Sequence, residues 1–382
     1  MFAAKWTAIG RRLAVRGRPN RPPATVGQIG HRHILAPLAA TALAGAAVMA
    51  GVAATRARGG RRPAGAEPPP HPPAASPREP EPPGVPVLLQ ARMLARADAV
   101  IASLAGARGA PDARTVHAVR KDLKRLRAEL LLFGEILGPK RARREDRRVA
   151  SIARQLAHAR DAEVMLATLD ALAARHPRRL GRRRSVLRLR KRIAREQSGA
   201  HSRLGDPLAR AQLLGSLVTL RERIASVDAR SADPAAIERA YREIYRGGRE
   251  ACRSALAGHY GARRMHRWRR EVKSLRYASE ALSKCGSQPP ARLGKLARRA
   301  DDLGEMLGDE HDLVVFSQWV RAQPRKGPRK LRVGRRARAE LLRAARLRRR
   351  ELRARALRDG ERLYAAKPAK VSGAAARALS SR

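Results

Sequence analysis

Residues 117–127 read HAVRKDLKRLR and residues 266–276 read HRWRREVKSLR, so one basic pattern occurs twice in the chain. In each copy, basic side chains stand at positions i, i+3, i+4, i+7 and i+10. At about 100° per residue, these positions lie within an arc of about 120° on one helix face. We call the two sets the basic stripes: His117, Arg120, Lys121, Lys124 and Arg127, and His266, Arg269, Arg270, Lys273 and Arg276.

The opposite face of each predicted helix is apolar. It carries Val119, Leu123, Leu126, Leu130 and Phe133 in the first copy, and Val272, Leu275 and Leu282 in the second. Helices of this kind bury the apolar face and expose the other. The cations of one stripe extend over about 15 Å of helix axis, which is long enough to meet several consecutive phosphates. We therefore predict that the two stripes hold a polyanion.

The composition favours an all-α fold with an anionic partner. Of the 382 residues, 43% are hydrophobic but only 3% are aromatic, whereas a β-sandwich would be richer in aromatic and β-branched residues. The 84 lysines and arginines exceed the 33 acidic residues, which gives a net charge of +51. A compact body with this excess repels itself unless anions neutralise it, and phosphate polymers fit that role. Part of the excess is also explained by solvated helix faces.

The two cysteines, Cys252 and Cys285, form no metal-binding or redox motif. We expect two free thiols, which fits a reducing compartment and a cytoplasmic protein.

The first 86 residues differ in composition from the rest. Residues 1–62 form a basic extension, within which residues 34–55 carry no charge and are long enough to span a bilayer. This segment, rich in alanine and glycine, is interpreted as a weak membrane anchor, an export signal or an extension without structure. Residues 63–86 are rich in proline and are predicted to be a linker. The pattern is helical from residue 87 to about 364, and we expect residues 367–382 to be a disordered tail.

A second motif follows each basic stripe at similar spacing: LAHARDAEV at residues 156–164 and LGDEHDLVV at residues 307–315. The order and spacing of both motifs predict a duplicated helical unit, with repeats at about 87–230 and 234–365. The second motif adds a group of supporting residues. These are Arg147, Arg154, Arg160 and Asp161 in the first repeat, and His311 and Asp312 in the second.

With these motifs, residues 87–366 resemble the CHAD family, a histidine-bearing α-helical domain. The resemblance rests on both basic stripes, on Arg160-Asp161 and His311-Asp312, and on the closing RLYAAKP run at residues 362–368. It implies two related four-helix bundles about a pseudo-twofold axis, with a central basic groove. It also implies that the groove binds inorganic polyphosphate through the residues of both stripes. Targeting to polyphosphate granules is a further hypothesis for such a module.

The chain departs from the family pattern in two ways. CHAD domains often stand beside triphosphate tunnel enzymes, but here the only E-x-E pair, Glu79 and Glu81, lies in the linker and is followed by Pro83. The second departure is an acidic stripe on the helix after the second basic stripe, composed of Asp302, Glu305, Asp309 and Asp312. Without a nucleophile or a glycine-rich phosphate loop, we expect no catalysis and no cofactor.

Several other interpretations of these residues stay open. His117 and His266 are candidate metal ligands, but cations surround both, and we expect no metal site. Each could instead satisfy a backbone group. Asp161 and Asp312 are candidates for an acid–base pair, but they more simply orient arginine or lysine side chains. The acidic stripe could bind Mg²⁺ or Ca²⁺, or pair with arginines on an adjoining helix.

The main competing function is nonspecific nucleic-acid binding. Some binding to DNA or RNA at low salt is expected from the charge alone. The low aromatic content, however, leaves few platforms for stacking bases, and no helix-turn-helix, zinc-finger or RNA-recognition signature is evident. A phosphoanhydride-hydrolysing or phosphoanhydride-forming enzyme lacks a supporting set of residues. The sequence does not identify protein partners.

Overall fold

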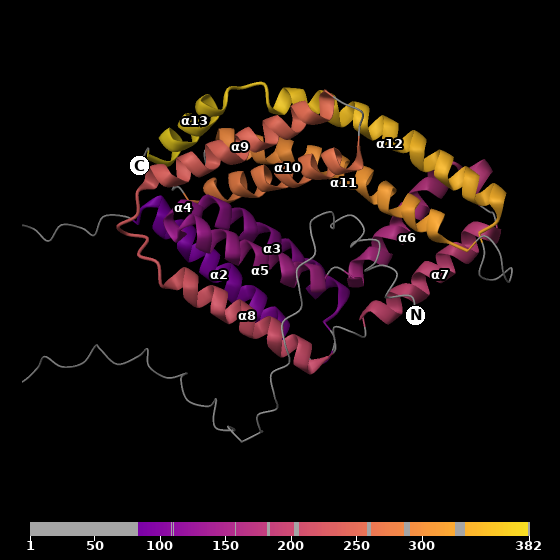
Figure 1. Ribbon diagram of the computed structural model, residues 1–382, viewed down its shortest axis with the longest axis horizontal. Coiled ribbons are helices and arrows are strands. Elements are labelled where there is room, and N and C mark those ends of the chain that lie inside the picture. The colour runs from indigo at the N-terminus through magenta and orange to yellow at the C-terminus, as the bar shows by residue number, and fades with distance from the viewer. Residues whose placement is uncertain are drawn as a thin grey trace, which may run out of the picture. The chain divides into compact units, whose positions relative to one another are not determined.

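The computed structural model describes residues 83–380 except 108, 110, 157, 182–183, 202–205, 258–260, 286–290 and 325–332. All of these residues belong to one compact unit, residues 76–382. The described elements are helical, which confirms the all-α prediction (Figure 1). They are α2 (Val85–Ala105), α3 (Ala113–Leu132), α4 (Gly134–Leu137), α5 (Pro139–Gln155), α6 (His158–Arg175), the π-helical turn η1 (Pro177–Gly181), α7 (Arg184–His201), α8 (Pro207–Ala225), α9 (Pro234–Leu256), α10 (Ala262–Leu282), α11 (Ala291–Ala322), α12 (Arg335–Leu363) and α13 (Pro368–Ser380).

Several helices begin at aspartate or proline, as their sequences predict. The Asp112 carboxylate accepts a hydrogen bond from the Thr115 amide (2.6 Å) and caps α3. The Asp233 carboxylate accepts one from the Ala235 amide (2.8 Å) at the start of α9. Such caps satisfy amides that lack a partner in the first helical turn. Gly138, with φ of 89°, makes the sharp turn between α4 and α5, where a side chain would be strained.

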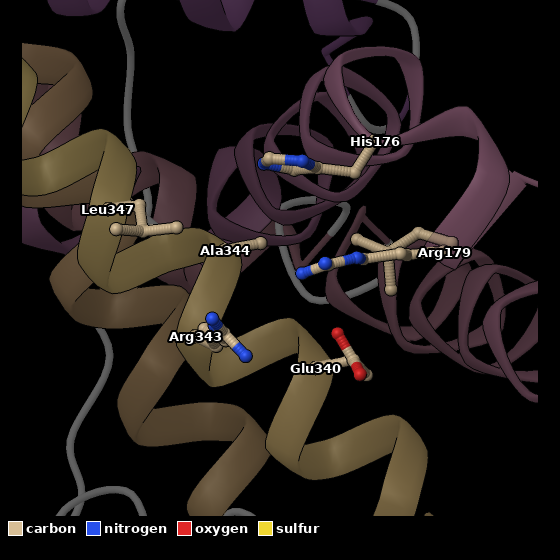
Figure 2. A pocket seen from close by; sticks show the side chains of 7 residues that line it. His176, Arg179, Glu340, Arg343, Ala344 and Leu347 are labelled. Carbon is tan, nitrogen blue, oxygen red and sulfur yellow. The ribbon is translucent and has the colours of Figure 1, made fainter.

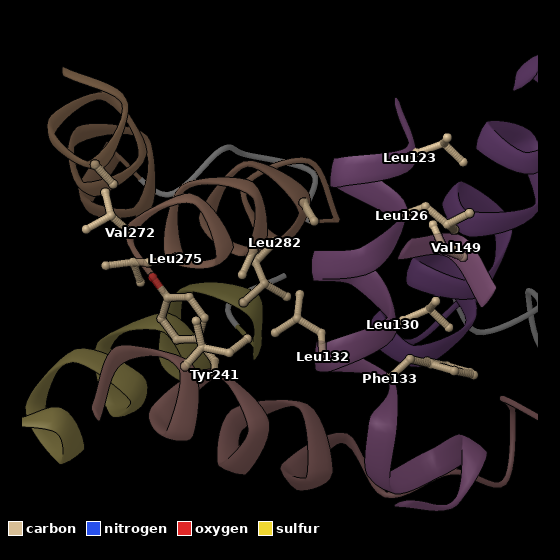
Figure 3. Packing of buried hydrophobic residues seen from close by; sticks show 14 of the residues in the cluster. Leu123, Leu126, Leu130, Leu132, Phe133, Val149, Tyr241, Val272, Leu275 and Leu282 are labelled. Carbon is tan, nitrogen blue, oxygen red and sulfur yellow. The ribbon is translucent and has the colours of Figure 1, made fainter. Parts of the chain in front are cut away.

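The apolar faces predicted for α3 and α10 form the core. All eight apolar side chains named above are buried, with exposed fractions between 0 and 1%. α3 and α10 also pack against each other. Figure 3 shows Leu132 of α3 near Leu282 of α10, and Tyr241 of α9 belongs to the same buried cluster. The two basic stripes therefore lie on neighbouring helices whose buried faces share one core.

The first basic stripe lies on α3 and its following motif on α6, while the second stripe lies on α10 and its motif on α11. The buried side chains, however, are not divided by repeat. One cluster joins α2, α3, α5 and α8 to α9, α10 and the first half of α11. A second cluster joins α6, η1 and α7 to the second half of α11 and the first half of α12. One four-helix bundle per repeat, related by a pseudo-twofold axis, stays a prediction.

The prediction of a disordered tail after residue 366 was wrong, because residues 368–380 form α13. Pro368 begins this helix, a position where proline needs no amide donor. The α13 helix packs against α9, where the Ser372 hydroxyl is fully buried. This hydroxyl accepts a hydrogen bond from Arg242 Nε (3.0 Å) and donates one to the Glu238 carboxylate (3.1 Å). The sequence of this short segment does not reveal its contact with α9, because the partner residues lie about 130 positions earlier in the chain.

The extension 1–62, including segment 34–55, lies outside the described residues, as does most of the predicted linker 63–86. The linker ends slightly earlier than predicted, since α2 begins at Val85. Among the helices that the structure describes, none is both long enough and apolar enough to cross a membrane.

Candidate anion-binding site

The basic stripes lie on the sides of α3 and α10 that face away from the core. His117, Lys121, His266 and Arg270 are exposed. The other members are half-buried: Arg120, Lys124, Arg127, Arg269, Lys273 and Arg276. The two helices are also linked through their polar faces, because Arg125 of α3 lies 3.6 Å from the Glu280 carboxylate of α10. The structure thus places the two stripes on adjacent helices.

The last arginine of each stripe is neutralised by carboxylates. Arg127 forms a two-pronged ion pair with Asp146 of α5, at 2.6 and 2.9 Å. Arg276 is paired with Glu280 at 2.8 Å and with Asp301 of α11, and it lies 5.0 Å from the centre of the Tyr277 ring. Ion pairs and hydrogen bonds of this kind fix the guanidinium in place. We therefore assign both arginines mainly to holding the stripe helices on α5 and α11.

The two middle arginines, Arg120 and Arg269, lie against small residues of the next helix. Arg120 Nη1 donates a hydrogen bond to the Ala153 carbonyl of α5 (3.0 Å). A Cβ atom placed on Gly308 of α11 would lie 3.7 Å from Arg269 Nη2, and one on Gly304 would lie 3.9 Å from Lys273 Cγ. The stems of two cations of the second stripe thus run along α11. The sequence analysis missed these glycines, although their spacing of four residues matches that of Arg269 and Lys273.

His266 and His311 are brought together, an arrangement that the sequence analysis did not predict. Their ring centres are 4.7 Å apart, with an angle of 41° between the planes. Desolvation and the nearby cations of the second stripe lower the pKa of His266. Desolvation, Arg269, His266 and Lys273 together lower the pKa of His311 to about 3. Both rings are therefore neutral near pH 7, and each can donate one hydrogen bond to an anion.

The acidic stripe on α11 is largely exposed. Asp302, Glu305 and Asp309 are exposed, and Asp312 is half-buried. Desolvation raises the pKa of Asp309, although Arg348 and Arg269 oppose this shift.

Two carboxylates that flank the acidic stripe form strong ion pairs. One is Asp301, the partner of Arg276. The other is Glu310, which is 3% exposed and lies 3.0 Å from Arg349 and 2.7 Å from Arg353 of α12. The predicted pairing with an adjoining helix is thus made by these neighbours of the acidic stripe, and it joins α11 to α10 and to α12.

The supporting residues of the first repeat are only partly described. Arg147 and Arg154 are exposed on α5, the helix that packs against α3. Arg160 and Asp161 have helical backbones in α6, but their side chains lie outside the described residues. In the second repeat, His311 joins the basic stripe through His266.

Metal ligation and thiol chemistry find no support in the described part of the chain. No three histidine, cysteine or acidic side chains among the described residues converge as a metal site would require. Cys252 and Cys285 are both buried free thiols. Burial raises the pKa of each to about 11, so both stay protonated at neutral pH. Thiols of this kind are unreactive because the thiolate is the nucleophile.

A small pocket lies apart from the basic stripes, between η1 and α12. Its walls include both cationic and acidic groups. The lining residues are His176, Arg179, Leu180, Glu340, Arg343, Ala344 and Leu347. Figure 2 shows Arg179 of η1 and Arg343 of α12 on opposite sides of this hollow, with the Glu340 carboxylate nearby.

Comparisons with known proteins agree with this description. The family model of the CHAD domain matches residues 91–321. PptA from Streptomyces chartreusis, a solved structure, is 18% identical with a TM-score of 0.55, and the match covers 74% of this chain and 99% of that one. The crystal structure of the CHAD domain from the plant Ricinus communis is 17% identical with a TM-score of 0.47, and the match covers 77% and 92%. No curated protein matches the sequence. The likeness to PptA shows a shared fold.

Proposed function

The chain belongs to the CHAD domain family, and from this premise we propose that it binds inorganic polyphosphate through the two basic stripes, without catalysing a reaction. The family is known to bind polyphosphate. The observation that carries the proposal is that α3 and α10 are neighbours whose outward faces both carry a stripe of cations. We further propose that these faces form the walls of a central basic groove between two related four-helix bundles.

The residues of the stripes suit a chain of phosphates. Polyphosphate carries about one negative charge per monomer and no bases, so only charge, hydrogen-bond donors and groove geometry can recognise it. Arginine offers a planar fork of donors, lysine a mobile point charge and neutral histidine a single donor. We propose that the members of each stripe together contact the polymer, while the fifth member also holds its helix to a neighbouring helix through carboxylates. Cations at these positions can follow a polymer along the helix axis.

Nucleic acid is the alternative ligand for the same charge. Exposed aromatic side chains are the usual platforms for stacking single-stranded bases. On the two stripe helices the aromatic side chains are Trp268 and Tyr277, and both are buried. The stripes therefore offer phosphate contacts without base contacts. We expect DNA and RNA to bind more weakly than polyphosphate, and only at low salt.

Titration of the full chain with long-chain polyphosphate and with duplex DNA tests this function. Both polymers are supplied at equal phosphate concentration in about 0.15 M salt, where weak polyelectrolyte binding is screened. The test variant is Lys124→Glu/Lys273→Glu, which reverses one charge in each stripe. The matched control is Lys367→Glu/Lys370→Glu, which makes the same charge change at two exposed lysines near α13.

We expect tight binding of polyphosphate and at least tenfold weaker binding of DNA by the parent protein. The stripe variant should lose most of the polyphosphate affinity, whereas the control should stay within about twofold of the parent, since screening weakens distant charges. Equal affinity for the two polymers, or equal losses in the two variants, would contradict the proposal. The measurement would then describe only a strongly basic helical protein.

A further inference from the structure

The outward face of α12 is a second strongly basic surface, separate from the basic stripes. This helix contains twelve arginines, no lysine and four carboxylates. Five of its arginines form hydrogen bonds or ion pairs with other residues of the chain. Arg338 donates hydrogen bonds to the Arg321 and Gln323 carbonyls. Arg348 pairs with Glu351, Arg349 and Arg353 pair with Glu310, and Arg362 lies 3.8 Å from Asp359.

The other seven arginines of α12 are exposed, and none of them pairs with a carboxylate that the structure describes. They are Arg335, Arg336, Arg343, Arg346, Arg350, Arg355 and Arg358. Arg336, Arg343 and Arg350 are spaced seven residues apart, so they follow one line along the helix for about 21 Å. Glu340 lies close to this line in the pocket of Figure 2, together with Arg179 of η1, which adds a cation from a second element.

The α9 helix shows that this arrangement is not general to the arginine-rich helices of the protein. Arg239, Arg246 and Arg253 have the same spacing of seven residues and are also exposed. On α9, however, Arg239 pairs with Glu135 and Asp233, and Arg246 pairs with Glu243 and, at 3.9 Å, Glu250. Two of these three arginines on α9 thus pair with described carboxylates, whereas none of Arg336, Arg343 and Arg350 on α12 does. Unbalanced guanidinium groups repel one another, and an anionic partner removes that cost.

The α12 surface and the basic stripes are carried by different helices. α12 packs mainly on α11, to which Glu310 binds it, and α11 in turn packs on α10 (Figure 1). Between α12 and the second stripe lies the α11 helix, along which Arg269 and Lys273 run. The two basic surfaces are therefore separated by α11.

We propose that the outward face of α12 is a second polyphosphate-binding surface, so that one protein molecule holds two polymer segments and cross-links long chains. The exposed residues of α12 are arginine, glutamate, alanine and leucine, with no aromatic group for bases, which favours polyphosphate over nucleic acid. Two binding surfaces on one body give multivalent attachment to a long polymer. The inference rests on the proposed function of the basic stripes and extends it from binding to cross-linking.

The test uses the full chain and three sets of substitutions. The α12 variant is Arg336→Gln/Arg343→Gln/Arg350→Gln. The control is Arg239→Gln/Arg246→Gln/Arg253→Gln, which removes the same charge at the same spacing from α9. The third set is the stripe variant Lys124→Glu/Lys273→Glu, alone and combined with the α12 substitutions. Light scattering with long-chain polyphosphate reports cross-linking, and a direct titration at several salt concentrations reports binding.

We expect the parent and the α9 control to form large assemblies with long-chain polyphosphate. The α12 variant should still bind but should scatter no more than the free protein. The stripe variant should keep weak binding that the added α12 substitutions reduce by at least tenfold. The logarithmic salt slope of this residual binding should fall by about 2 to 3, as expected for three lost phosphate contacts.

The outcomes separate this inference from the proposed function. Assemblies of equal size with the α12 variant, or equal losses in the α9 control, would overturn the second surface while leaving the basic stripes intact. Absence of polyphosphate binding by the parent would overturn both. Equal assembly with duplex DNA would assign the α12 surface to nucleic acid and would also refute the inference.

Discussion

Binding of polyphosphate should strengthen as the pH falls, because of the histidine pair His266 and His311. In the free protein, desolvation and the second-stripe cations Arg269 and Lys273 lower the pKa of both rings, that of His311 to about 3. A bound polyanion supplies negative charge beside the rings and offsets the repulsion from those cations. The pKa of each ring therefore rises on binding, and the complex takes up protons.

The size of the effect follows from the pKa of about 3 in the free protein. Full restoration of His311 to the ordinary histidine pKa of about 6.5 would raise the association constant about tenfold between pH 7.5 and pH 5.5. Tenfold is therefore the upper limit for this residue, because the polymer offsets the repulsion from the cations but not the desolvation, which is the largest cause of the shift. His266 acts in the same direction. The free energy of unfolding changes with pH in the opposite direction. Because the pKa values are lowered in the folded protein, stability is fully present above the ordinary histidine pKa and is lost as the pH falls below it.

The assay is a titration of the full chain with long-chain polyphosphate at pH 7.5, 6.5 and 5.5 and constant ionic strength. The internal phosphates of the polymer are strongly acidic, so its own charge changes little over this range. The variant His266→Asn/His311→Asn should show a shallower profile than the parent, with His117 of the first stripe still in place. An affinity that falls on acidification, or a parent profile as flat as that of the variant, would refute the reasoning.

Three further predictions concern stability and are read from urea unfolding of the free protein. Arg276→Met should lower the free energy of unfolding by about 1–3 kcal/mol because it leaves Asp301 without its partner and Glu280 with Arg125 alone, whereas Lys121→Met should change it by less than about 0.5 kcal/mol. Equal effects would contradict the structural role of Arg276. Glu310→Gln should cost about 3 kcal/mol, since two arginines of α12 lose a buried counter-charge, and a loss below about 1 kcal/mol would show that solvent already screens them. Gly360→Ala should lower the free energy of unfolding by about 1–3 kcal/mol because the added methyl group meets Trp268 and Cys252. Gly304→Ala, whose methyl group would have its nearest neighbour at 3.7 Å, should be neutral or slightly stabilising. A larger loss of stability in Gly304→Ala than in Gly360→Ala would refute the close packing of Gly360 on Trp268.

The sequence predicts the helices and their inward faces well, because both depend on local periodicity. The eight apolar residues predicted for the two stripe helices are buried. Asp233 and Gly138, each followed by proline in the sequence, stand at a helix cap and at a turn. The sequence predicts α13 poorly. That segment is short and its apolar residues are mostly alanines, and it packs on α9 through contacts that are distant in sequence.

The site was predicted as a pattern of charges, whereas the division of roles within it required the structure. Spacing placed all ten stripe residues on two helix faces, but it treated Arg127 and Arg276 like the other members. Their carboxylate partners lie on different helices, and no periodicity in α3 or α10 reveals them. The contact between His266 and His311 is equally nonlocal. The arginines of α12 and α9 also have the same spacing in the sequence. Only the structure shows which of them pair with a carboxylate.

Lysine modification in the presence and absence of polyphosphate is the most direct test of binding at the two stripes. An amine-reactive reagent would be applied to the unaltered full chain, and the acetylated sites would be quantified by mass spectrometry. We predict that polyphosphate protects Lys121, Lys124 and Lys273 and leaves Lys367 and Lys370 as reactive as before. Equal protection of all five lysines, or protection confined to the last two, would contradict binding at the stripes of α3 and α10.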